Sequence, residues 1–343
     1  MRLTRDTLIK IARDTASQRA RVSRRLVCIY LTGSVLGDSP LLGGTTDIDL
    51  IMIHDSEPPQ PREIVRLTDE IHLDISHYSQ SLFHQPRHLR VDPWLGPFIY
   101  SKPMVLHDTQ HWFDFIQAST GAQFFQADYT FQRANNLAQA ARQGWMDLAL
   151  NNSAPHPRRV HDLLKVLENA GNALVCLTDE GKPLAERRFL LQFPLRVQAF
   201  NQPELISEMT HLVVPDPTEL EGAWPAWLES WRQAYQTAGK HEDVPAQIHP
   251  ARYLYYERAA NTIWDENPDA AAWLLLRSWS LAACYIDADD PSQAVWQSAC
   301  RLAGLDEEQF EERVQAADRY LDHIEETMET WGRSNGVSTL SEG

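Results

Sequence analysis

Apolar residues follow two different spacings along this chain, and the change between them divides the sequence. In the first part, a helix is predicted at 4–25, where Leu8, Ile11 and Ala12 fall at helical spacing. Short apolar or alternating runs then predict strands at 26–31, 47–53, 71–78 and 103–107. From residue 123 onward, apolar residues recur every three or four positions. That spacing predicts long helices at 124–150, 158–178, 184–200, 218–238, 248–264, 269–286, 291–302 and 306–331.

This order of elements predicts an α+β protein. We expect a small α/β domain at 1–115 with a mixed sheet of about four to five strands. A larger, all-helical domain is expected at 120–333. The tail at 334–343 is small and polar, and we expect it to be disordered.

The charge is distributed unevenly between these two parts. The net charge is −16, with 13 basic and 14 acidic residues at 1–115 against 18 and 33 at 116–343. A nucleic-acid-binding protein normally presents a basic face, so nucleic acid is an unfavoured partner. An acidic half could attract a cationic ligand, or it could serve solubility alone.

The remaining composition argues for a cytoplasmic protein. No run of about 18 apolar residues predicts a membrane span, and the polar start of the chain does not resemble a signal peptide. The four cysteines show no CxxC spacing, which argues against a zinc site or a disulfide framework and fits a reducing compartment.

Two carboxylates share one face of the second predicted strand. Asp47 and Asp49 lie two residues apart, so they project together while Ile48 and Leu50 face the other side. Adjacent carboxylates repel each other unless a cation lies between them. Oxygen ligands with room for phosphate suit Mg²⁺, and two such ions can hold both oxygens of an in-line displacement. We therefore expect a two-ion magnesium site here.

A Gly-Ser pair lies at the end of the first predicted strand. Gly33 would let backbone N–H groups approach a phosphate, and a helix beginning there would add its positive end. The hydroxyl of Ser34 could bond a phosphate oxygen. A lone Gly-Ser is usually a turn and a lone Asp-x-Asp usually a surface pair, but the two together are more specific.

This combination resembles the signature of the DNA polymerase β-type nucleotidyltransferase superfamily. The matching residues are Gly33-Ser34 and, after twelve residues, Asp47-Ile48-Asp49. The helical half is similar to the architecture of aminoglycoside nucleotidyltransferases and related bacterial proteins. The signature covers about 25 residues and leaves the acceptor open. The chain departs from the pattern in its longer loop and in Leu36-Gly37-Asp38, which stands where a basic residue is usual.

The resemblance implies further site residues. A third carboxylate is expected on a later strand, and Asp74 is the best match, ahead of Asp69 and Glu70; it would complete the metal site or act as general base. Nucleotide contacts are expected from Gly33, Ser34, Thr46 and Lys165, with Lys102 as another basic candidate. A tyrosine cluster at 253–256 could stack on a base or sugar, although core packing is the favoured interpretation.

The favoured function is an enzyme that moves a nucleoside monophosphate, AMP from ATP, to an acceptor hydroxyl and releases pyrophosphate. The acidic half favours a small cationic acceptor such as an aminoglycoside. One alternative is a protein adenylyltransferase or an antitoxin-like enzyme. Another is a non-catalytic nucleotide-binding protein, which the presence of Asp47, Asp49 and Asp74 argues against. The oligomeric state is left open.

Overall fold

The computed structural model describes residues 3–151, 153–215 and 217–338, which form two compact units. The first spans Met1–Phe124 and the second Phe125–Gly343. The first contains the sheet and the second is helical, so the predicted α+β class is confirmed.

A five-stranded mixed sheet forms the centre of the first unit, with the strand order β3-β4-β2-β1-β5. The pair β2–β4 is parallel and the other three pairs are antiparallel. The bounds are β1 Leu26–Thr32, β2 Thr46–His54, β3 Arg62–Arg66, β4 Ile71–Ser79 and β5 Met104–Asp108. Four of these strands lie where the apolar runs predict them.

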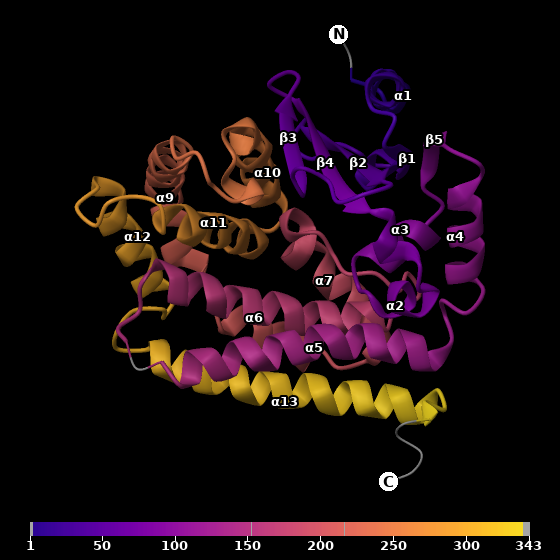
Figure 1. Cartoon of the computed structure of the whole chain (residues 1–343). Coiled ribbons are helices and arrows are strands. Elements are labelled where there is room, and N and C mark those ends of the chain that lie inside the picture. Colours follow the sequence, from indigo (N-terminus) through magenta and orange to yellow (C-terminus); the bar gives the residue numbers. More distant parts are fainter. Residues whose placement is uncertain (1–2, 152, 216, 339–343) are drawn as a thin grey trace. The chain divides into compact units, whose positions relative to one another are not determined.

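Each face of the sheet has its own apolar core. Helix α1 (Arg5–Val22) packs against the face formed by alternate residues such as Leu31, Leu50 and Leu73. The opposite face, with Tyr30 and Ile53, packs against residues of α2, α3 and α4, which lie below and to one side of the strands in Figure 1. These helices span Pro86–Val91, Leu95–Tyr100 and Trp112–Gly121. The second core covers only part of its face, toward the C-terminal end of β2.

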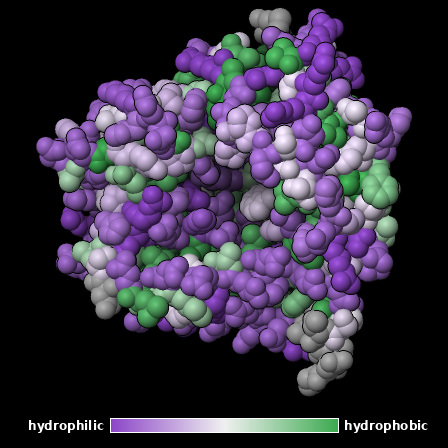
Figure 2. Space-filling view, viewed as in Figure 1, coloured by the Kyte–Doolittle hydropathy of each residue, from purple (hydrophilic) through white to green (hydrophobic). Residues whose placement is uncertain are grey.

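The second unit is a set of packed helices. Helices α5, α6 and α13 run side by side (Figure 1), and α11 is buried from Ala270 to its last residue, Ala283. Figure 2 shows mainly hydrophilic residues on the visible face of this unit. The bounds are α5 Ala127–Ala149, α6 Pro157–Cys176, α7 Phe189–Val197, α8 Glu204–His211, α9 Pro217–Ala238, α10 Tyr253–Glu266, α11 Pro268–Ala283, α12 Pro291–Leu302 and α13 Phe310–Ser334.

The last described residues continue this packing. Val337 is buried, and the backbone N–H of Ser338 donates to Asp128 on α5. Residues 339–343 of the predicted tail lie outside the described residues. Within the part of the chain that the structure describes, no helix is long and apolar enough to cross a membrane.

Candidate metal centre

Three aspartates meet on one face of the sheet, near the N-terminal ends of β2 and β4. The parallel register places Asp49 directly beside Asp74, and Asp47 beside His72. Directly paired residues point to the same side of a sheet, so the carboxylates of Asp47, Asp49 and Asp74 share one face. One carboxylate oxygen from each aspartate lies within 4.8 Å of those from the other two. We call these three residues the acidic triad.

The triad lies in a largely desolvated position. Asp47 is 8% exposed and Asp74 4%, while Asp49 is half-buried. Burying like charges side by side is unfavourable because each weakens the solvation of the others and repels them. Three carboxylate oxygens that converge in this way form the hard, anionic donor set that Mg²⁺ prefers. The residues present therefore fit a divalent cation.

Gly33 makes the space that Asp49 occupies. It follows β1 with φ +78° and ψ −159°, a conformation that only glycine adopts readily. A Cβ built at this position would lie 1.9 Å from Oδ2 of Asp49 and 2.8 Å from its Cγ. The glycine was predicted for close approach to a phosphate, and the structure adds that it also lets the Asp49 carboxylate lie against the end of β1.

Ser34 and Thr46 connect the two strand ends beside the triad. The Ser34 hydroxyl lies 3.4 Å from the Thr46 hydroxyl and 3.4 Å from the carbonyl oxygen of Pro40. Thr46 is buried and donates to the carbonyl of Asp47 at 3.1 Å. Only a single 3-10 turn, η1 (Ser34–Leu36), follows Gly33. Three residues do not build an appreciable helix dipole.

Arg62, which was not predicted as a site residue, holds the third aspartate. Arg62 Nε donates to Asp74 Oδ1 at 2.7 Å, and its Nη2 donates to Oδ2 at 2.6 Å. The antiparallel register pairs Arg62 with Ser76 and Ile64 with Asp74, so Arg62 lies on the same face as the triad. The available signal was the two-residue spacing of Arg62, Ile64 and Arg66, which places all three on one side of a short strand after Pro61.

The other candidate acidic residues lie apart from the triad. Asp69 pairs with Arg66 in the turn before β4, and Glu70 accepts a hydrogen bond from Thr68 at 3.0 Å. Asp74 is therefore the third carboxylate of the cluster, as the resemblance implies.

The basic and aromatic candidates remain predictions where nucleotide binding is concerned. Lys165 is exposed on α6 of the second unit, and Lys102 is exposed before β5 with φ 55°. In the tyrosine cluster, Tyr256 is buried, and the ring of Tyr253 stacks on Trp231 at a centroid distance of 5.8 Å. The Arg187 guanidinium lies 3.3 Å from the centroid of the Tyr255 ring. These contacts agree with the favoured packing interpretation.

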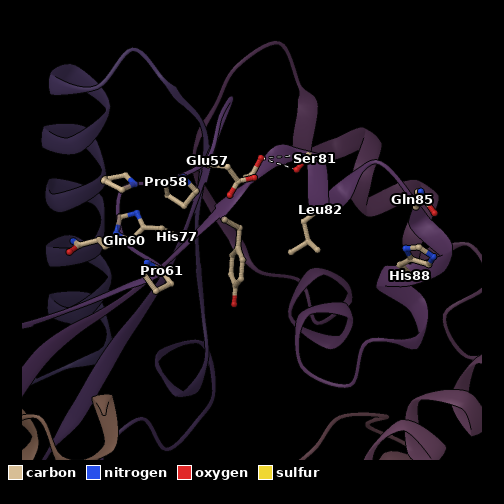
Figure 3. Close-up of a pocket in the computed structure, with 12 residues that line it drawn as sticks. Glu57, Pro58, Gln60, Pro61, His77, Ser81, Leu82, Gln85 and His88 are labelled. Carbon is tan, nitrogen blue, oxygen red and sulfur yellow. Dashed lines mark hydrogen bonds between the residues drawn. The ribbon is translucent and has the colours of Figure 1, made fainter. Parts of the chain in front are cut away.

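Two further features of the first unit are less suited to this chemistry. Asp108, His111 and Asp114 also place ligand atoms together, but His111 and Asp114 are exposed and both oxygens of Asp108 accept from the N–H of Phe113. A cavity of about 540 Å³ lies beside the C-terminal end of β4, between the Pro58–Pro61 segment and the side chains of Leu82, Gln85 and His88 (Figure 3). No triad residue lines this cavity.

Sequence comparison does not assign this site to a family, because no protein-family model and no curated protein matches the chain.

Proposed function

We propose that the chain is a Mg²⁺-dependent nucleotidyltransferase of the DNA polymerase β type. The observation that supports this best is the convergence of Asp47, Asp49 and Asp74 beside Gly33-Ser34 on a mixed sheet. Such an arrangement costs stability in the absence of a cation, and it offers the ligands that phosphoryl-transfer sites use.

The proposed reaction transfers AMP from ATP. An oxygen of the acceptor hydroxyl forms a bond to the α-phosphorus, the bond between that phosphorus and the bridging oxygen breaks, and pyrophosphate leaves with the electron pair. The hydroxyl proton passes to a base, for which Asp74 is the candidate that the resemblance implies. Bound Mg²⁺ would lower the pKa of the attacking hydroxyl and neutralise charge on the departing pyrophosphate.

The chain's own residues would hold the donor in line. Asp47, Asp49 and Asp74 supply the ligands, and two ions are proposed by analogy with two-metal sites. Backbone N–H groups near Gly33 and the Ser34 hydroxyl would contact phosphate oxygens, a role supported by their position beside the triad. Thr46 is buried at the start of β2, and its contact with the nucleotide stays a prediction.

A small cationic acceptor is proposed from the charge of the second unit. That unit carries 18 basic and 33 acidic residues, and a strongly negative surface raises the local concentration of cationic ligands. An aminoglycoside carries several amines, which make it cationic, and several hydroxyls, one of which can accept the nucleotide. The proposal for the acceptor is independent of the proposal for the donor site.

The test is pyrophosphate release by the purified chain with Mg²⁺, each of the four nucleoside triphosphates and a panel of aminoglycosides. We expect release with ATP and at least one aminoglycoside. Asp49→Asn, which keeps shape but removes charge, should lower turnover by at least about 10³-fold, because the ligand set loses an anionic oxygen.

The outcomes separate the alternatives. Release with no aminoglycoside but with a protein acceptor would favour a protein adenylyltransferase. Absence of release with every acceptor, together with ATP binding, would favour a non-catalytic nucleotide-binding protein. An Asp49→Asn variant as active as the wild type would refute the proposed mechanism.

A further inference from the structure

Arg62 is the strongest feature of the first unit that the proposed reaction does not use. It lies on the edge strand β3 and contacts Asp74 with two short hydrogen bonds, one to each carboxylate oxygen. Such a planar, two-point contact fixes the orientation of a carboxylate as well as its position. Asp74 is 4% exposed, so it has little water to compensate for losing this contact.

We propose that Arg62 is a positioning residue for the metal centre, an inference that rests on the proposed function. Arg62 fixes the plane of the Asp74 carboxylate and thereby its approach to Asp47 and Asp49. Its positive charge also offsets part of the negative charge of the triad, which lowers the affinity of the site for a divalent cation. Arg62 therefore makes the site bind a divalent cation less tightly but holds its ligands in a fixed arrangement.

The orientation part of this proposal follows from the geometry of the pair. A free aspartate can rotate about both side-chain torsions, but two parallel hydrogen bonds to a guanidinium restrict both of them. Asp49 is the register partner of Asp74, and its own carboxylate is confined against Gly33. With Arg62 in place, two of the three ligands are therefore held from opposite sides of β2.

The charge part follows from distance and exposure. A guanidinium in direct contact with Asp74 lies close enough to repel any cation that the same carboxylate binds. The side chain of Arg62 is 41% exposed, so water screens this repulsion. Removing the charge should therefore tighten cation binding only about threefold to fivefold.

Lysine cannot reproduce both effects. It keeps the positive charge but presents a point-like ammonium without the two-pronged geometry. Arg62→Lys thus tests orientation alone, and Arg62→Gln tests orientation and charge together. Arg66 gives a matched control, because it lies on the same face of the same strand and pairs with Asp69 outside the triad.

The experiment measures Mn²⁺ affinity by electron paramagnetic resonance without nucleotide, and pyrophosphate release with ATP and acceptor. We expect Arg62→Gln to bind Mn²⁺ about threefold to fivefold more tightly while its turnover falls about 50-fold. Arg62→Lys should keep the wild-type Mn²⁺ affinity within twofold while its turnover falls about tenfold. Arg66→Gln should match the wild type within twofold in both.

In Arg62→Gln, the Mn²⁺ affinity should rise while the turnover falls. These opposite changes distinguish a positioning role from a merely structural one. If Arg62→Gln binds Mn²⁺ more weakly, in step with a lower melting temperature in EDTA, Arg62 only stabilises the strand and the proposal fails. It also fails if Arg62→Gln matches the wild type in both measurements. If the wild type releases no pyrophosphate but Arg62→Gln still tightens Mn²⁺ binding, the charge effect stands and nucleotidyl transfer is refuted.

Discussion

Each unit contains a cluster of buried charged side chains, and the two clusters differ in how their charges are compensated. The acidic triad gathers three like charges, and Arg62 contacts one of them, Asp74. In the second unit, Arg277 on α11 is 6% exposed and contacts Glu168 on α6 with Nε and Nη2 at 3.1 and 3.0 Å. Its Nη1 contacts His161. The second cluster is balanced by its own residues.

The difference indicates which cluster serves a ligand. A buried ion pair satisfies itself and has no need of a further ion, although it contributes little net stability compared with apolar packing. A cluster of like charges is destabilising until a cation arrives, and a fold retains it where binding or catalysis requires it. On this reasoning, breaking the balanced pair should harm folding, while weakening the triad should harm function.

The largest expected effect on stability comes from breaking the balanced pair. Arg277→Met should lower the free energy of unfolding by about 3 kcal/mol, because it leaves Glu168 buried without its partner. Burial already raises the pKa of Glu168, and protonation of this residue would limit the loss. Chemical denaturation at pH 7 measures the change.

A double variant provides the control for that measurement. Arg277→Met combined with Glu168→Met should lose less stability than Arg277→Met alone, because no charge is then left buried. Equal losses in the single and double variants would mean that the pair does not account for the effect.

A smaller effect on stability, with a strong effect on turnover, is expected at Gly33. Gly33→Ala should cost about 2–3 kcal/mol of stability from backbone strain. It should also reduce turnover at least tenfold, because the new Cβ would displace the Asp49 carboxylate. Gly44→Ala is the matched control, since Gly44 also has positive φ (+71°) but no atom lies within 4 Å of its added Cβ. This control should lose about 1 kcal/mol and keep its activity; equal turnover in both variants would contradict the role of Gly33.

The smallest expected effect concerns a histidine pair on the opposite face of the sheet. His54 Nε2 and His77 Nδ1 lie 3.0 Å apart, and burial lowers the pKa of both rings below the ordinary value. Their contribution to stability is therefore present above the unfolded pKa near 6.5 and lost as the pH falls through the lower folded values. Between pH 7 and 5, His77→Asn should reduce the loss of stability by about 1 kcal/mol or less.

The control for the histidine experiment is His111→Asn. His111 is 90% exposed at its side chain and has φ 57°, which asparagine tolerates. This variant controls for the loss of a histidine ring at an exposed position. A His77→Asn variant with an unchanged pH profile would show that the pair is not coupled to folding.

Local patterns predict much of the fold and the core of the site. Short apolar or alternating runs were enough to locate β1, β2, β4 and β5. The two-residue period of a strand placed Asp47 and Asp49 on one face. Asp74 followed from the resemblance together with its position between Leu73 and Ile75, both of which face the α1 core.

The features that were missed depend on contacts distant in the sequence. Strand β3 lies at the edge of the sheet with an exposed and half-buried pattern, so periodicity gave it no strong signal. The contact between Arg62 and Asp74 follows only from the register of β3 on β4.

The measurement that tests the central claim most directly is the Mg²⁺ dependence of unfolding for the wild type and Asp49→Asn at constant ionic strength. In EDTA, the variant should be as stable as the wild type or more stable by about 0.5–1 kcal/mol, because one of three like charges is removed. When the Mg²⁺ concentration is above its dissociation constant, the free energy of unfolding of the wild type should rise by about 1.4 kcal/mol for each tenfold increase in that concentration. The free energy of unfolding of the variant should rise much less. Equal gains in both proteins, or no gain in the wild type, would contradict a metal centre at the triad.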